Sequence, residues 1–308
     1  MNRESIPAGY LLVLSVLMLG MAFSCAGPRT TQEGASSGGA DYDRQLKGLD
    51  RLIRQNPDSA ELFIMRGQTY YSLANFDAAR ADFSRAIDID SSNFVARYNR
   101  GLSYIKGSVY DSAVQDFEAL LEMDTVHAKA LNHLGFSYLK RYKLEAALVA
   151  LSDAIQSDAD LLSAYLNRGA VYYLLNQPAE AIRDYNTVIS KAPEHAVAYS
   201  NRGLAQYTMD QTDYAMQDLD KALEIDSTLA VAWYNRGLAK SQSADFAAAM
   251  VDFDRAIQLE AAEAEFYMGR GFARFQEGDT LGAKADFDMA VQHNEALRII
   301  IEDKLLDD

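Results

Sequence analysis

Apolar residues recur at helical spacing in short segments along the chain, and these segments come in pairs separated by turn signals. Residues 165–173 and 181–189 show the spacing clearly, with apolar side chains three or four residues apart. Between them, Asn176-Gln177-Pro178 is a turn signal, and a proline at this point suits the first turn of a second helix. The pattern therefore predicts two antiparallel helices joined by a tight turn.

The helix pairs follow one another with a period of 34 residues that does not slip. Each copy carries a glycine, an alanine twelve residues later, and a large apolar residue four residues further on. Self-similarity at a fixed period of this length is the mark of a solenoid. The glycines are Gly67, Gly101, Gly135, Gly169, Gly203, Gly237 and Gly271; the alanines are Ala79, Ala113, Ala147, Ala181, Ala215, Ala249 and Ala283; and the large apolar residues are Phe83, Phe117, Leu151, Tyr185, Leu219, Phe253 and Phe287.

These residue types have a packing reason. Two antiparallel helices approach closely only where side chains are small, so we expect the glycine of the first helix to face the alanine of the second. The large apolar residue then fills the space beside that contact. Each hairpin leaves one flank apolar, and the next hairpin covers it, so stability is shared between neighbours. The sequence predicts an all-α fold of stacked hairpins.

The segment Ala232-Trp-Tyr-Asn-Arg-Gly-Leu-Ala comes closest to a known consensus. The pattern resembles the tetratricopeptide repeat family, whose consensus joins Trp-x2-Leu-Gly-x2-Tyr to a later Ala-x3-Phe and a proline. The resemblance covers roughly residues 42–297 and implies a right-handed superhelix of antiparallel helix pairs. It departs from the consensus in one respect, because arginine replaces leucine before six of the seven glycines.

Helices with one apolar side flank the array. Residues 41–59 predict an N-terminal capping helix, residues 60–297 hold the seven 34-residue repeats, and residues 298–308 predict a C-terminal capping helix. Ile299 and Ile300 leave an apolar excess on the last helix, which could seat a second protomer as a homodimer or simply cover the last hairpin.

The net charge of the chain limits the classes of partner that it can bind. The chain has 29 Lys and Arg against 44 Asp and Glu, a formal net charge of -15. Such a field repels nucleic acid and anionic lipid surfaces, so we expect no nucleic-acid partner. The single cysteine excludes a disulfide framework or a thiol-rich metal site.

Residues 1–24 resemble a signal peptide, because an apolar run of suitable length follows Arg3 and Glu4 and ends in small residues. Ala22-Phe-Ser-Cys resembles a bacterial lipobox, which implies lipidation of Cys25, and residues 25–40 would be a flexible linker. We expect a membrane-anchored lipoprotein of the bacterial cell envelope, in the outer rather than the inner membrane. A free cysteine beside an ordinary cleavage site, or an uncleaved anchor, is the alternative.

Arginine and aspartate recur together, sixteen residues apart, in every repeat except the third, where Leu134 and Ala150 take both places. Joint presence and joint absence favour an ion pair within one hairpin, since the guanidinium fork suits a carboxylate. Two alternatives stay open: pairing between neighbouring repeats, and inheritance from a repeat ancestor without any interaction. The pairs are Arg66 with Asp82, Arg100 with Asp116, Arg168 with Asp184, Arg202 with Asp218, Arg236 with Asp252, and Arg270 with Asp286.

Catalytic and metal-binding patterns are missing from the sequence. The four histidines, His127, His133, His195 and His293, form no HExxH or other compact ligand spacing, and no nucleophile motif or phosphate-binding loop occurs. We therefore expect neither an enzyme nor a cofactor.

The resemblance implies that the first helix of each repeat lines a concave groove that binds extended peptides. An asparagine amide there could read a peptide main chain, or could instead bond within its own repeat. Lys106, Lys129 and Lys140 could anchor an acidic segment, although solvated lysines are commoner. The remaining candidates for the groove are Asn99, Asn167, Asn201, Asn235, Tyr71, Tyr173, Tyr207 and Phe275.

The expected function is a membrane-tethered scaffold or assembly factor that binds partner polypeptides. Similar repeat lipoproteins assist the assembly of envelope complexes, pili or secretion systems. The alternative is an adaptor that delivers substrates to a periplasmic protease or a cell-wall hydrolase, which a stable enzyme in a pull-down would reveal. A chaperone-type carboxylate clamp is not supported, because Ile64 and Gln68 occupy two positions that it needs.

Overall fold

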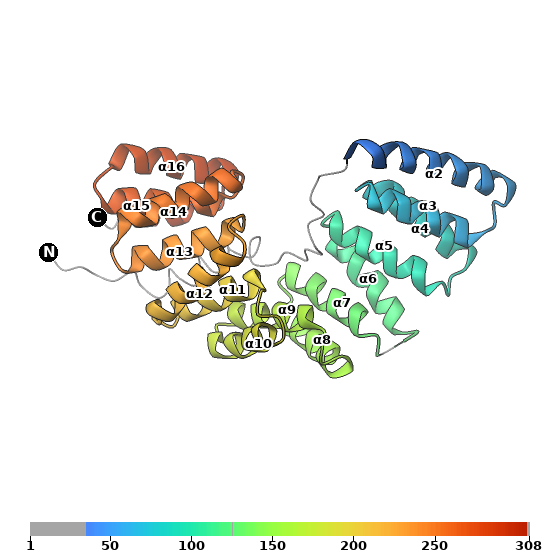
Figure 1. Ribbon diagram of the computed structural model, residues 1–308, viewed down its shortest axis with the longest axis horizontal. Helices are drawn as coiled ribbons and strands as arrows, with labels where there is room; N and C mark the ends of the chain where they lie inside the picture. The colour runs from blue at the N-terminus through green and yellow to red at the C-terminus, as the bar shows by residue number, and fades with distance from the viewer. Residues whose placement is uncertain (1–34, 125, 307–308) are drawn as a thin grey trace. The chain divides into compact units, whose positions relative to one another are not determined.

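The computed structural model describes residues 35–124 and 126–306, and its regular elements there are sixteen α-helices (Figure 1). The prediction of an all-α solenoid of helix pairs is confirmed. The helices are α2 (Ala35–Gln55), α3 (Ala60–Ser72), α4 (Phe76–Ile89), α5 (Phe94–Lys106), α6 (Tyr110–Leu121), α7 (Ala128–Lys140), α8 (Leu144–Ser157), α9 (Leu162–Leu174), α10 (Pro178–Lys191), α11 (Ala196–Tyr207), α12 (Thr212–Ile225), α13 (Ala230–Gln242), α14 (Phe246–Leu259), α15 (Ala264–Gln276), α16 (Thr280–His293) and α17 (Leu297–Leu306).

The helices form hairpins that stack in chain order. Helix α3 packs on α4 and α4 on α5, and the same alternation joins α11 through α16. The chain divides into two compact units, whose boundary falls between Asn167 and Arg168 inside α9. The sequence pattern, which runs through this point without interruption, had predicted one array. We refer to the described residues up to Asn167 as the N-terminal unit and to those from Arg168 as the C-terminal unit.

The turn within each hairpin depends on one residue with left-handed backbone. In the first hairpin this is Ala74, with φ of 57°, and the amide of Asn75 donates to the carbonyl of Tyr70 across the turn. This is the hydrogen bond that ends a helix in a Schellman motif. The Asn75 side chain then accepts from the amide of Ala78 and caps the second helix. The same backbone geometry recurs at Ser108, Tyr142, Asn176, Asp210, Ala244 and Gly278.

Each glycine of the repeat lies against the large apolar residue of the same hairpin. A Cβ atom added at Gly237 would come within 2.6 Å of Cε1 of Phe253, and one at Gly67 within 2.7 Å of Cε1 of Phe83. The large apolar residue thus fills the space beside the glycine, as the sequence predicted. In two other hairpins the carbonyl oxygen of the repeat alanine also lies close, that of Ala147 at 3.3 Å from a Cβ at Gly135 and that of Ala215 at 3.1 Å from one at Gly203. The alanine is fully buried, as Ala249 shows. The glycine thus makes room for a large apolar side chain and, at Gly135 and Gly203, also for the backbone of the second helix.

The ends of the array differ in detail from their predicted bounds. Helix α2 begins at Ala35, so it includes six residues that the sequence assigned to the linker. Once a helix is nucleated, each further residue adds a backbone hydrogen bond, and even small residues can extend it. At the other end, α17 buries Leu297 and Ile301, while Ile299 is 76% exposed. The predicted signal peptide, Cys25 and most of the linker lie outside the described residues. Among the residues described, no helix combines the length and the apolar character needed to cross a membrane.

Candidate functional site

Six arginines and six aspartates lie together within their own hairpins. In each pair the arginine Nε and Nη2 donate to the two carboxylate oxygens at 2.6–2.9 Å, which is the bidentate geometry. The aspartates are buried, with Asp252 only 1% exposed and Asp218 the most exposed at 7%. Hydrogen bonding to the aspartate raises the pKa of the Arg100 and Arg236 guanidiniums, so these cations stay charged.

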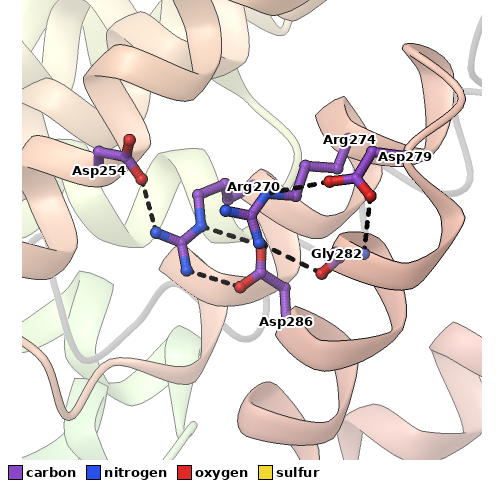
Figure 2. A network of polar contacts seen from close by, with 6 residues as sticks. All are labelled: Asp254, Arg270, Arg274, Asp279, Gly282 and Asp286. Carbon is purple, nitrogen blue, oxygen red and sulfur yellow. Dashed lines mark hydrogen bonds and ion pairs between the residues drawn. The ribbon is translucent and has the colours of Figure 1, made fainter.

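The third arginine donor reaches the preceding hairpin, which the sequence analysis missed. Nη1 of Arg270 donates to Asp254 at 2.5 Å while its fork holds Asp286 (Figure 2). Arg274 adds a second cation, with Nη1 at 3.0 Å from Asp286. The sequence feature that could have revealed this contact is a polar residue sixteen positions before the arginine in each of these repeats. The equivalent partners are Asp50 for Arg66, Ser84 for Arg100, Asn186 for Arg202, and Asp220 for Arg236.

The third repeat shows what replaces the arginine. Leu134 and Ala150 are buried at 7% and 5% exposure, so apolar packing fills the space. Glu118, at the position that an arginine of the next hairpin contacts elsewhere, accepts instead from the hydroxyl of Tyr138. Burial, followed by the bond to Glu118, raises the pKa of Tyr138 to about 12. The arginine and aspartate therefore link hairpins, but a repeat can pack without them.

Three of the four candidate asparagines are buried and bonded inside the array. Asn167 donates to Oδ1 of Asn132 at 3.0 Å, and Asn235 donates to Oγ of Ser200 at 3.2 Å. Asn201 is 4% exposed and bonds to the Tyr185 hydroxyl. Asn99 is partly exposed, and its amide donates to the carbonyl of Val95. These contacts match the alternative of bonding within the array, and reading of a peptide main chain by these residues stays a prediction.

The candidate aromatics differ in accessibility. Tyr207 is 4% exposed, and burial raises its pKa to about 12. Burial also raises the pKa of Tyr173, whose hydroxyl has no hydrogen-bond partner among the described residues. Tyr71 and Phe275 are partly exposed, and the ring of Tyr71 lies edge-on to Phe76 with centroids 5.5 Å apart. Tyr173 is partly exposed as well, although its hydroxyl is buried, so Tyr207 alone of these four candidates is buried as a whole residue.

The three candidate lysines come from two neighbouring first helices. Lys106 ends α5, Lys129 lies in the first turn of α7, and Lys140 ends α7. Lys106 and Lys129 are exposed. Nζ of Lys140 lies 5.8 Å from the ring centroid of Phe136, a cation–π distance.

His133, which belongs with Lys129 and Lys140 to the basic group of the third repeat, is close enough to Lys106 and Lys129 for their charges to act on it. Its ring stacks on Phe117, with centroids 5.6 Å apart, and meets the edge of Tyr98 at 5.8 Å. Burial lowers the pKa of His133 to about 4, and the positive potentials of His127, Lys106 and Lys129 act in the same direction.

A buried carboxyl group in the C-terminal unit is a second feature that the sequence did not reveal. Glu265 on α15 is 5% exposed, and burial raises its pKa to about 7. The Tyr234 ring is fully buried, and Glu265 acts electrostatically on its hydroxyl, which has no hydrogen-bond partner among the described residues. Among all residues that the structure describes, no group of three or more His, Cys, Asp or Glu residues is arranged to hold a metal ion.

Helical hairpins that stack on their neighbours in chain order define the class of helical repeat proteins, or solenoids. Models of the tetratricopeptide repeat match residues 67–108, 98–161, 163–195, 196–229 and 230–263. The chain belongs to the tetratricopeptide repeat family. Proteins of this family are generally binding scaffolds for other proteins rather than enzymes.

Solved structures show the same fold. A tetratricopeptide repeat protein from Parabacteroides merdae is 17% identical, with 92% of this chain and 98% of that chain covered and a TM-score of 0.64. Pseudomonas aeruginosa pilF is 18% identical, with 67% and 94% covered and a TM-score of 0.57. YrrB, described as a repeat protein with an unusual peptide-binding site, is 24% identical, with 61% and 96% covered and a TM-score of 0.50. No protein of curated function matches the sequence.

Proposed function

We propose that the chain is a membrane-tethered scaffold that binds an extended stretch of a partner polypeptide on its first helices. The observation that carries this proposal is the set of accessible candidates on α3, α5, α7 and α15. In the N-terminal unit, Tyr71, Lys106 and Lys129 come from first helices and reach solvent, and in the C-terminal unit Phe275 does so on the first helix α15. Accessible aromatic rings and exposed lysines on first helices can contact a partner. Buried polar groups instead make hydrogen bonds inside the stacked hairpins.

The division of the asparagines sharpens the proposal. Asn167 and Asn235 join neighbouring first helices, and Asn201 joins its first helix to Tyr185 on the second helix α10, so all three are positioning residues for the binding face. Asn99 is the one candidate amide with side-chain surface accessible to a partner. The partner is therefore recognised mainly by aromatic contacts and by charge, with Asn99 as the polar contact to its main chain.

Capture of the partner tests this function. The purified chain is immobilised, envelope extract is passed over it, and bound proteins are identified by mass spectrometry. Tyr71→Ala should reduce capture of the main partner about tenfold, because aromatic anchors at the centre of an interface contribute upwards of 1 kcal/mol. Tyr214→Ala is the matched control, since Tyr214 is 62% exposed on the second helix α12. Equal losses for both variants, or none for either, would reject the proposed face.

The membrane tether has its own test. Metabolic labelling with a fatty acid should mark the wild-type chain in the membrane fraction, whereas Cys25→Ala should give an unlabelled protein in the soluble fraction. The supporting feature is the position of the only cysteine, directly after an apolar run that ends in small residues. A wild-type chain that carries no label would reject lipidation at this residue.

A further inference from the structure

A cluster of cationic and ionisable side chains lies where α5 packs beside α7 in the N-terminal unit. The ring of Tyr98 on α5 lies between two imidazoles, with centroids 5.8 Å from His127 and 5.8 Å from His133. Lys129 and His133 are four residues apart on α7, so they share one face of that helix. Lys106, at the end of α5, acts on His133 from the neighbouring helix.

The positive charge of this cluster is uncompensated. Within the described part of the chain, neither Lys106 nor Lys129 has a carboxylate within ion-pair distance, although the whole sequence carries a net charge of -15. The groups that act on His133 are Tyr98, Lys106, His127 and Lys129 from around α5 and α7, and Phe117 of α6 covers its ring with an apolar face. No titratable group of α8 is among them.

The imidazole itself has an unmet hydrogen-bonding need. Nδ1 of His133 is buried and has no hydrogen-bond partner in the residues that the structure describes. By contrast, Nδ1 of His127 accepts from the amide of Ala130 at 3.1 Å and caps α7. A buried polar atom without a partner is costly, and the two lysines that act on this imidazole, which make no ion pair among the described residues, favour the binding of a negatively charged group.

We propose that Lys106, Lys129 and His133 form a binding site for a carboxylate-bearing segment of the partner polypeptide, and that His133 takes up a proton from solvent when this segment binds. The inference rests on the proposed function, because it places an acidic stretch of the partner on the first helices of the N-terminal unit. The lysines hold the carboxylates directly. The imidazole responds to the change of potential, so no direct contact with the ligand is required.

The direction of the coupling follows from linkage. In the free protein, burial and neighbouring cations keep His133 neutral. A bound carboxylate replaces repulsion by attraction, so it raises the pKa of His133, and protonation in turn strengthens binding by the same free energy. If the bound pKa returns to the ordinary value of about 6.5, affinity should be about tenfold higher at pH 5.5 than at pH 7.5.

Calorimetry with hexaglutamate as the probe and the full chain as the receptor measures both effects. Titrations at pH 6.0 in two buffers of different ionisation enthalpy should show uptake of a fraction of a proton for each peptide bound. Lys129→Gln should lower affinity at least fivefold, whereas Lys143→Gln, which removes an exposed lysine of the same unit, should not. His133→Gln should keep binding at pH 7.5 and lose the gain at pH 5.5.

Nuclear magnetic resonance gives a readout that does not depend on any variant folding. The His133 ring signals of the wild-type chain should titrate near pH 4 without peptide and at least one unit higher with it. Unchanged titration, or the same pH dependence of affinity in His133→Gln, would overturn the proton coupling. Equal affinity of hexaglutamate for wild type and Lys129→Gln would overturn the site, even where partner capture remains sensitive to Tyr71→Ala and the proposed function stands.

Discussion

The Arg202–Asp218 pair offers the cleanest measurement of what the ion-pair ladder contributes. Nε and Nη2 of Arg202 each donate to a carboxylate oxygen at 2.7 Å, and Nη1 reaches Oδ1 of Asn186 in the preceding hairpin. Asp218 has no second cation among the ion pairs of the described residues, unlike Asp252, which also meets Lys240. Arg202→Leu and Asp218→Ala, alone and together, convert this hairpin to the residues of the third repeat.

The two single changes should differ in cost. Arg202→Leu leaves a carboxylate that is 7% exposed without its cation, so we expect a loss of about 3–5 kcal/mol. Asp218→Ala leaves a guanidinium whose side chain is 20% exposed and which still donates to Asn186, so about 1–3 kcal/mol is expected. The double variant should be more stable than the sum of the two losses by about 1–3 kcal/mol, the coupling energy of a contacting pair.

Urea unfolding followed by circular dichroism gives the free energies, and hydrogen exchange of the α11 amides gives the local loss. Local exchange is needed because a repeat array can unfold in parts rather than all at once. Losses that add to within about 0.5 kcal/mol would refute the ion pair as an energetic unit.

The third repeat supplies the reverse experiment. Leu134→Arg and Ala150→Asp should each destabilise the chain, because each buries a single charge at a site that is 7% or 5% exposed. The double variant should recover most of the stability, because the new arginine and aspartate can pair. Glu118 also lies sixteen positions before residue 134, where Nη1 of the arginine finds its partner in other repeats. A double variant no better than the worse single variant would show that the backbone of this repeat does not bring the two side chains together.

The remaining predictions concern the turn, the core and the buried acid. Gly237→Ala should cost about 1–3 kcal/mol, because its Cβ would lie 2.6 Å from Cε1 of Phe253; no loss in urea unfolding would show that the ring can move away. Ala244→Gly should stabilise by up to about 1 kcal/mol, since φ is 61° there, and a fall in melting temperature would contradict this. Burial raises the pKa of Glu265 from about 4.5 to about 7, so its contribution to stability is present below pH 4.5 and lost as pH rises through 7. Glu265→Gln should therefore be about 2–3 kcal/mol more stable than wild type at pH 8 and about equal to it at pH 4, and an advantage that does not vary with pH would refute the linkage.

The sequence predicted the parts of this fold that repeat. A fixed period brings the same residue types to the same place in every hairpin, so the helices, the turn at Pro178 and the partnership of arginine with aspartate all follow from spacing. Contacts across hairpins were harder, because the residue sixteen positions before each arginine changes type between Asp, Ser and Asn. Nη1 of the arginine can donate to an oxygen of any of these three residue types. The contact between hairpins is therefore kept, although the sequence pattern that would reveal it is weaker.

Features that occur once could not be predicted from the repeat. The left-handed turn residue is Gly278 in one hairpin and Asn176 in another, which suit that backbone, but it is Tyr142 or Ala244 elsewhere, where the surrounding hydrogen bonds impose the conformation. His133 likewise has no equivalent in the other repeats. Its burial depends on Phe117 and Tyr98 of other helices, so its properties follow from packing that only the structure describes.

The third repeat separates what holds a hairpin together from what joins it to its neighbours. Gly135 keeps the close contact of the other repeats, since a Cβ there would meet Cγ of Leu151 at 2.5 Å, although the arginine and aspartate are gone. The apolar contact is therefore sufficient for the hairpin to form, whereas the arginine elsewhere adds the bidentate pair within its own hairpin and a third hydrogen bond to the hairpin before it, as Arg202 shows. Because this repeat has Leu134 in place of that arginine, Glu118 of the preceding hairpin accepts a hydrogen bond from the hydroxyl of Tyr138 instead. The same repeat also carries Lys129 and His133, which have no equivalents at the corresponding positions of the other repeats.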